Sequence, residues 1–227
     1  MGNSFWVSPV FLMAVAFTIV FGCYSYIYLP LQMRRAYRQS LLTLARAVET
    51  KDVGAEGHGE RVARYVVDIA REMRIPRSQI LRMEYAALLA DIGNVRVPYA
   101  ILSKKGKLTA KEFEILKQHA VIAAEMVEQV RLLKDLAPLI RHHHECWDGS
   151  GYPDGLKGEE IPLGARILAV ATAYDSMESK KSFHDKMDDK RAIEELKSNA
   201  GVKYDPAVVE AFLKVLQRRW RNERQLS

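Results

Sequence analysis

The sequence predicts an all-α protein, a compact bundle of about seven helices preceded by one transmembrane helix. Helical periodicity recurs along most of the chain, no strand-like alternation of apolar and polar residues persists, and the first 33 residues carry no charged side chain. Of the 227 residues, the roughly 194 that follow this uncharged segment are enough for one globular domain, and the net charge of +6 is modest. Because basic residues are not interleaved with aromatic ones, we expect no nucleic-acid partner.

The N-terminal segment is long and apolar enough to span a bilayer as a helix. Phe5–Leu31 is mostly apolar or aromatic, and about 20 such residues suffice. A signal peptide is the alternative, but no basic residue precedes the apolar run. Arg34, Arg35 and Arg38 follow the segment at once, and basic residues mark the cytoplasmic side of a membrane. We therefore expect a retained single-pass anchor with the rest of the chain in the cytoplasm.

Composition also indicates how the chain is divided. The two cysteines are separated, with Cys23 in the apolar run and Cys146 in the remainder, so no disulfide is expected within the domain. The C-terminal end is rich in arginine. We expect four segments: a transmembrane anchor at 1–33, a linker helix at 34–51, the globular domain at 52–213 and a basic tail at 214–227.

The first helices of the domain follow from apolar stripes and caps. Thr109 and Glu112 form a capping box at the start of "TAKEFEILKQH", which opens a helix whose apolar stripe runs from Phe113 through His119 to Val130. Two earlier stripes have the same helical spacing: Val62, Val66, Ile69 and Met73, then Ile80, Met83, Ala87 and Leu88.

The later helices are marked mainly by proline and glycine. "DLAPLIRHHHE" is expected to be helical, with Pro138 near its start, where proline is tolerated. "PLGARILAVATAYDSM" is typical of a long buried helix, and Gly201 is expected to cap the helix of "DDKRAIEELKSNAG". Asp205 and Pro206 suit the N-cap and first position of the last helix.

Histidines and one aspartate suggest a metal centre. Three consecutive histidines precede Glu145, and neighbouring residues on a helix diverge by about 100°, so two of the imidazoles share a cavity only if it lies between them. There are alternatives to a metal site: the three consecutive histidines could be solvent-exposed, and His119, on the apolar stripe, could be a hydrogen-bonded core residue. Imidazole and carboxylate ligands together suit Fe, Mn, Zn or Ni. We expect a cluster of four residues: Asp91, His119, His143 and His144.

A loop rich in Gly, Pro and Asp follows the histidines. It runs over Trp147–Pro162, 16 residues, and loops of this length in compact domains tend to be functional. A plain connector is the alternative. Its glycines would let backbone amides approach a phosphate closely. We expect a substrate- or phosphate-binding role for five of its residues: Asp148, Gly149, Gly151, Tyr152 and Pro153.

"HHECWDGSGYP" together with "GLKGEEIPLGARILAVA" resembles the HD-GYP domain, a branch of the HD metal-dependent phosphohydrolases, over about Leu41–Leu213. The resemblance implies an all-α fold and hydrolysis of cyclic di-GMP, or a related cyclic dinucleotide, in bacterial signal transduction. It implies two or three metal ions, commonly iron or manganese. Combined with the apolar segment, it implies the bacterial inner membrane. It leaves room for a protein partner at the loop and for a homodimer.

The resemblance also identifies individual ligands. The family's first histidine matches His58 in "GHGERV", and the aspartate of its "HD" pair matches Asp91, the bridging and catalytic position. The histidine that follows the lysine-containing helix matches His119. The paired histidines before the glutamate match His143 and His144.

Three positions depart from the family pattern. Where the family has "LLHDIGK" this chain has "LLADIGN", so Ala90 replaces the defining histidine and Asn94 replaces a phosphate-assisting lysine. Thr172 stands where the family has a late aspartate ligand. In the family one ion uses the positions of His58, Ala90, Asp91 and Thr172, and the other ion uses Asp91, His119, His143 and His144.

Half of one ligand set is therefore missing and the other set is complete. We expect one tightly bound ion, of Fe or Mn, in place of two. The domain is then weakly active or a binding and regulatory module. An active phosphodiesterase in which Asp175 or water replaces the lost ligands is the first alternative. A membrane-tethered scaffold without a ligand is the second.

Overall fold

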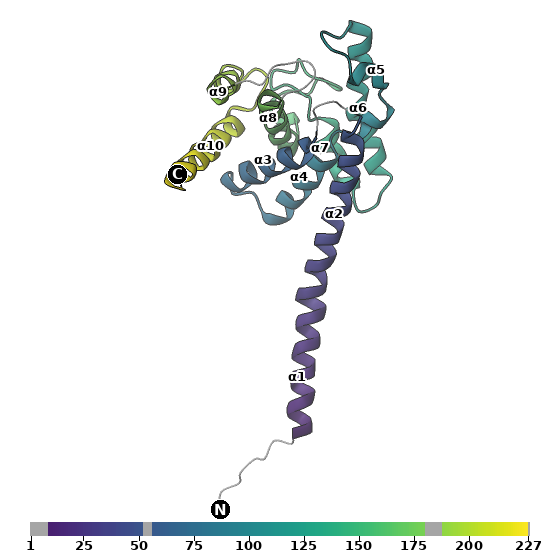
Figure 1. Ribbon diagram of the computed structural model, residues 1–227, viewed down its shortest axis with the longest axis vertical. Coiled ribbons are helices and arrows are strands. Elements are labelled where there is room, and N and C mark those ends of the chain that lie inside the picture. The colour runs from purple at the N-terminus through teal and green to yellow at the C-terminus, as the bar shows by residue number, and fades with distance from the viewer. Residues whose placement is uncertain (1–8, 52–55, 180–187, 227) are drawn as a thin grey trace, which may run out of the picture. The chain divides into compact units, whose positions relative to one another are not determined.

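The computed structural model describes residues 9–51, 56–179 and 188–226 (Figure 1). These residues form helices, turns and loops, and the described part of the chain contains no β-strand, which confirms the all-α fold class. The chain divides into two compact units, 1–40 and 41–227.

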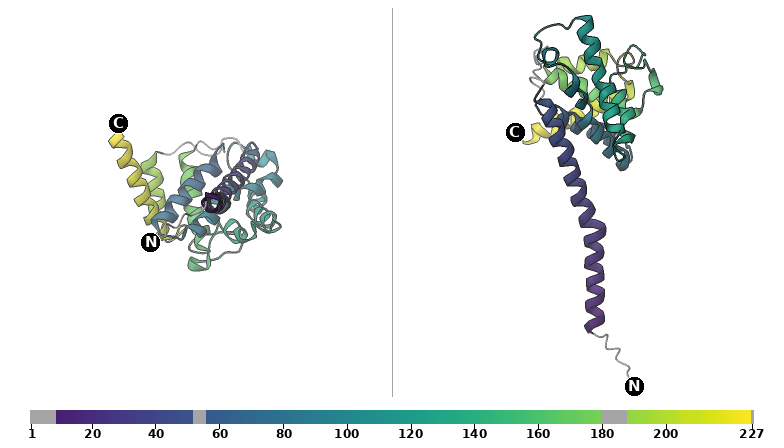
Figure 2. Two further views of the ribbon diagram at one scale, coloured as in Figure 1. Left: turned by 90° about the horizontal axis from the view of Figure 1, so that it is seen from below. Right: turned by 90° about the vertical axis from the view of Figure 1, so that its right-hand side faces the viewer.

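The second unit is a bundle of eight α-helices within the described residues, where about seven were expected. α9 and α10 lie side by side at the end of the bundle away from α5 and α6 (Figures 1 and 2). The bounds are α3 His58–Glu72, α4 Arg77–Leu89, α5 Tyr99–Leu102, α6 Ala110–Glu128, α7 Ala137–Arg141, α8 Leu163–Glu178, α9 Asp189–Ser198 and α10 Pro206–Leu226. Three short 3₁₀ helices complete the domain: η2 Ile92–Arg96, η3 Lys134–Leu136 and η4 Gly158–Glu160.

The core lies between α3, α8 and α10. The α3 stripe of Val62, Val66 and Ile69 is fully buried, as predicted. Tyr65 of α3 makes edge-to-face contacts with Tyr174 of α8 and Phe212 of α10, at ring-centroid distances of 5.3 and 5.5 Å. Such pairs contribute about 0.5–1.5 kcal/mol each beyond the burial of apolar area. This packing fixes α3 against α8, the two helices that carry His58 and Thr172.

One helix end and one apolar stripe differ from the sequence prediction. α9 ends at Ser198 with Asn199 as its C-cap, and Gly201 follows with a φ of +84°. The Asn199 side chain donates to the Glu195 carbonyl, which ends the helix before the glycine is reached. In α6 the capping box of Thr109 and Glu112 is present, but the outer parts of its expected stripe are exposed.

The boundaries assigned from the sequence remain predictions, and the structure adds detail to two of them. α2, Leu29–Glu49, runs across the expected boundary between anchor and linker, and its residues Leu41, Leu42 and Ala45 are buried. α10 continues to Leu226 and places Val215 in the core, so the described part of the expected tail is helical.

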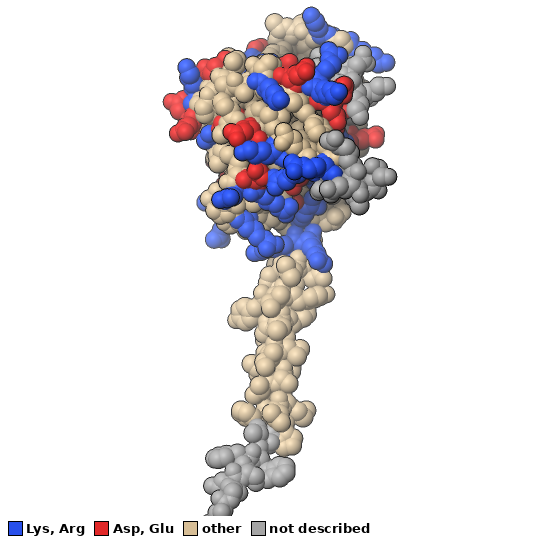
Figure 3. Space-filling model, turned by 90° about the vertical axis from the view of Figure 1, so that its left-hand side faces the viewer, with Lys and Arg blue, Asp and Glu red and all other residues tan. Residues whose placement is uncertain are grey.

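Within the described residues, one helix, Pro9–Glu49, is long and apolar enough to cross a membrane, judged by length and composition. α1, Pro9–Cys23, continues through a π-helical turn, Tyr24–Tyr28, into α2, and no residue of α1 is buried by protein. Figure 3 shows the outer part of this helix without charged side chains, whereas Lys, Arg, Asp and Glu are interspersed on the domain face in view. Residues 1–8, which include the start of the expected anchor, lie outside the described residues.

Candidate metal centre

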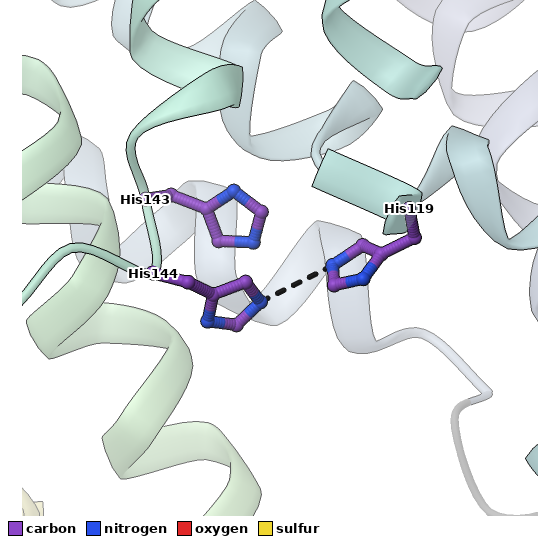
Figure 4. Close-up of side chains that lie close together, drawn as sticks. All are labelled: His119, His143 and His144. Carbon is purple, nitrogen blue, oxygen red and sulfur yellow. Dashed lines mark hydrogen bonds between the residues drawn. The ribbon is translucent and has the colours of Figure 1, made fainter. Parts of the chain in front are cut away.

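Three histidines meet in one place. His119 comes from α6, and His143 and His144 come from the turn after α7. One ring nitrogen of each lies within 4.8 Å of the others. Figure 4 shows the three rings facing one another, with 3.2 Å between Nε2 of His144 and Nε2 of His119. Three of the four residues of the predicted cluster therefore meet, and their role as metal ligands stays a prediction.

The rings of His119 and His143 are held in the tautomer that a metal ion needs. Nδ1 of His119 lies 2.6 Å from the Leu116 carbonyl oxygen, and Nδ1 of His143 lies 2.6 Å from that of Ile140. Because a carbonyl only accepts, each Nδ1 carries the hydrogen and each Nε2 keeps its lone pair. This arrangement is usual for metal-binding histidines.

His143 carries the clearest sign of a missing partner. Its side chain is buried, and its Nε2 has no hydrogen-bond partner in the part of the chain that the structure describes. An unsatisfied buried polar atom costs about 1–3 kcal/mol. Burial, with a smaller contribution from His119, lowers the pKa of His143 to about 4. The ring is therefore neutral near pH 7, the state in which imidazole binds metal. The residues present fit a transition-metal ion.

The prediction that the three histidines continue a helix was wrong. α7 ends at Arg141, and His142–His144 form a turn closed by a bond from the Glu145 amide to the His142 carbonyl oxygen, 3.1 Å. The turn removes the 100° divergence of neighbouring helical residues. The rings of His143 and His144 consequently lie side by side, with centroids 3.9 Å apart.

Asp91 lies between two of the predicted ligands. Its Oδ1 is 3.6 Å from Nε2 of His119, and its Oδ2 is 3.4 Å from Nε2 of His58. Gly93 makes this placement feasible, since an added Cβ there would lie 2.0 Å from the His119 carbonyl oxygen. Only glycine allows η2 to approach α6 this closely.

The ring nitrogen of His58 that faces away from Asp91 contacts the buried carboxylate of Asp175. This nitrogen, Nδ1, lies 2.6 Å from Oδ2 of Asp175. Arg61 donates one hydrogen bond to Oδ1 of the same carboxylate, 2.6 Å, and one to Oδ2, 3.0 Å. Burial alone would raise the pKa of Asp175, but the hydrogen bonds from His58 and Arg61 lower it to about 2. Both of its oxygens are thus engaged. Asp175 orients His58 and is not placed to replace a lost metal ligand.

The three departures from the family pattern occupy different environments. Thr172 and Asn94 line one pocket together with His58, Asp91 and His119. Asn94 is 8% exposed, and its Oδ1 has no hydrogen-bond partner. Ala90 caps the end of α4 and is buried at 4% exposure. Two of the three positions, Ala90 and Thr172, are ligand positions in the family. The methyl group of alanine and the hydroxyl group of threonine are poor ligands for a divalent ion.

The glycine-rich loop reaches the pocket through Tyr152. Its ring stacks on His144, with centroids 4.9 Å apart and planes 25° apart, and it lines the pocket. The structure provides an internal reason for Gly151, because an added Cβ would lie 2.2 Å from the Cys146 amide nitrogen. The predicted phosphate role of Asp148, Gly149 and the neighbouring loop residues stays a prediction.

Sequence reasoning missed the residues that anchor this loop. Glu145 accepts bonds from the amides of Asp154, 2.7 Å, and Gly155, 3.1 Å. The Asp154 carboxylate in turn binds Arg141, 2.7 Å, and Nε2 of His142, 2.9 Å. The first histidine of the run is therefore structural, and only the other two face the cluster.

Arg61 was also missed, although its spacing of three from His58 places both on one helix face.

The HD domain family model matches residues 43–208. A Thermotoga maritima protein named cyclic di-GMP phosphodiesterase is 41% identical over 169 residues, which cover 74% of this chain and 46% of the relative. The Xanthomonas campestris cyclic di-GMP phosphodiesterase response regulator RpfG is 37% identical, with coverage of 78% and 47%. The Vibrio cholerae 3'3'-cGAMP-specific phosphodiesterase 2 is 34% identical, with coverage of 82% and 36%. The chain spans less than half the length of these curated relatives.

Two solved structures share the fold. A cyclic GMP-AMP specific phosphodiesterase from V. cholerae superposes with a TM-score of 0.64 at 19% identity, covering 79% of this chain and 48% of that chain. An HDG"Y"P protein from Bdellovibrio bacteriovorus superposes with a TM-score of 0.59 at 18% identity, covering 80% and 60%.

Proposed function

The chain belongs to the HD-GYP family of HD-domain proteins, and we propose that it binds cyclic di-GMP or a related cyclic dinucleotide at a site with one tightly held metal ion. We further propose that it hydrolyses this ligand far more slowly than a site with two ions would. The names of the relatives support the ligand class.

One observation carries the proposal, the asymmetry of the site around Asp91. On one side stand three histidines, including the unpartnered Nε2 of His143. On the other side His58 remains, at 3.4 Å, while the positions of two further family ligands hold Ala90 and Thr172. A two-ion phosphodiesterase needs both sides, because the ions together clamp the attacking and leaving oxygens.

Different residues of the site would bind the metal ion and the cyclic dinucleotide. Asp91, His119, His143 and His144 would hold the ion, and imidazole with carboxylate suits Fe or Mn. Such an ion supplies a Lewis acid for a phosphate oxygen and lowers the pKa of a bound water. Tyr152, stacked on His144, forms one wall of the pocket. Asn94, in place of a lysine, offers the phosphate no positive charge.

An efficient cyclic dinucleotide phosphodiesterase is the second candidate. Two observations favour it: the relatives named above carry that activity in their names, and His58 still directs its Nε2 toward Asp91. Under this candidate a second ion is held by His58, Asp91 and water.

Binding and turnover of cyclic di-GMP separate the candidates. We expect the full chain, loaded with Mn²⁺ in detergent, to bind cyclic di-GMP at micromolar concentration and to convert it at about one hundredth or less of the rate of a two-ion enzyme, a barrier about 2.7 kcal/mol higher. Calorimetry measures the first and chromatography of the products measures the second. Turnover of several molecules per second would support the second candidate. Absence of any cyclic dinucleotide binding would contradict both candidates and favour a scaffold.

We also propose that the apolar helix anchors the chain in the bacterial inner membrane with the domain in the cytoplasm. The support is the length and composition of the helix and the basic residues that follow it: Arg34, Arg35 and Arg38. A cytoplasmic reporter fused after Ser227 is expected to be active, and a periplasmic reporter at the same position inactive. An active periplasmic reporter would contradict the orientation, and recovery of the fusion in the soluble fraction would contradict the anchor.

A further inference from the structure

The helix that carries His58 has no cap of its own. Gly57 is the N-cap residue of α3, with a φ of +70°, and it has no side chain that accepts from the first turn. The first amides of a helix have no partner within the helix. A carboxylate from outside α3 supplies the acceptors: Oε2 of Glu49 lies 2.8 Å from the Gly57 amide, and Oε1 lies 2.8 Å from that of Gly59.

Gly59 leaves the room that this carboxylate occupies. An added Cβ at Gly59 would lie 3.2 Å from Oε1 of Glu49 and 3.6 Å from the Leu88 carbonyl oxygen. The Glu49 carboxylate therefore sits against the residue that follows His58, close to the end of α4. It also carries the negative charge that a helix N-terminus favours.

The end of α2 is tied to the segment of Asp91 as well. Lys51, two residues beyond α2, donates from Nζ to the Val95 carbonyl oxygen of η2 at 2.8 Å. Glu49 also lines a small cavity together with Asp91 and Asn94. The end of α2 thus contacts both segments whose side chains, His58 and Asp91, face each other across 3.4 Å.

We propose that Glu49 is a positioning residue, which holds the first turn of α3 so that His58 orients Asp91 toward the histidine cluster. The inference rests on the proposed single-ion function and adds a residue that positions the ligands of that site. No ligand role is assigned to Glu49 itself.

The test measures Mn²⁺ affinity in the full chain in detergent. We expect Glu49→Ala to raise the Kd for Mn²⁺ about tenfold or more, the range seen when outer partners of metal ligands are removed. Glu49→Gln keeps the shape and one acceptor oxygen, and an intermediate increase is expected. Arg46→Gln is the matched control, because it breaks the exposed Arg46–Glu60 ion pair between the same two helices. It is expected to change the Kd less than twofold.

A double-mutant cycle with His58→Ala separates positioning from general stability. If Glu49 acts through His58, Glu49→Ala changes the Kd less than twofold in the His58→Ala background. An equal change in both backgrounds, or an unchanged Kd beside a lowered Tm, would overturn the inference while the single-ion site stands. A parent chain that binds no Mn²⁺ would overturn the proposed function and this inference with it. If Glu49→Ala fails to fold, Glu49→Gln carries the same cycle.

Discussion

Replacing His143 by alanine is expected to remove the tightly bound ion, with a rise in the Kd for Mn²⁺ of about a hundredfold or more. His143 is buried, its Nδ1 is fixed by the Ile140 carbonyl, and its Nε2 has no hydrogen-bond partner among the described residues. The substitution deletes one of three converging imidazoles and leaves Asp91 with two. Metal content after gel filtration, together with Mn²⁺ titration, measures the loss.

His142→Ala is the matched control for this prediction. It removes a neighbouring histidine of the same turn whose ring binds Asp154 and the Pro138 carbonyl instead of the cluster. We expect the ion to remain, with a change in Kd below about threefold. Equal losses in the two variants would mean that the turn as a whole matters and His143 is no ligand. Full retention of the ion in His143→Ala would reject the three-histidine site.

The combined substitution Ala90→His, Asn94→Lys and Thr172→Asp is expected to raise cyclic di-GMP hydrolysis about a hundredfold or more, which corresponds to about 2.7 kcal/mol of barrier. Thr172 and Asn94 already line the pocket that contains His58 and Asp91. The new imidazole and carboxylate would complete the depleted ligand set, and the ammonium would offset charge on the phosphate. Product chromatography gives the rate, and elemental analysis is expected to show two ions per chain.

Two control variants accompany this triple substitution: Ala90→His alone, and a triple variant with an uncharged asparagine at position 172. Ala90→His alone is expected to do little, because groups that act as one unit are strongly non-additive. The same triple variant with Thr172→Asn keeps the size of the new side chain without its charge, and we expect it to stay near the parent rate. Ala90 is buried, so an imidazole there costs about 1–3 kcal/mol of stability, which a Tm measurement detects. A folded triple variant that holds two ions yet hydrolyses no faster would show that the pocket has diverged from this substrate.

The local pattern of this chain was enough for its fold class and for several of its helix starts. The spacing of Val62, Val66 and Ile69 depends on helical geometry alone, and so does the capping box of Thr109 and Glu112. The assignment of His119, His143 and His144 came from a long specific motif, and the three rings do meet. The stripe and the capping box involve residues near one another in the chain, where spacing determines geometry. His119 and His144 lie 25 positions apart, so their meeting was predicted by the resemblance and not by spacing.

Only the tertiary structure decided which groups each of these side chains meets. The spacing did not indicate that the three histidines form a turn after the helix ends at Arg141. It also did not indicate that the His142 ring contacts the Asp154 carboxylate. Asp175 was open as a substitute ligand until its carboxylate proved to be engaged by His58, 117 residues away in the chain, and by Arg61. The cap supplied to α3 by Glu49 is likewise absent from any local motif. A hydrogen bond depends on distance and direction between atoms, and for residues far apart in sequence the packing of helices sets both.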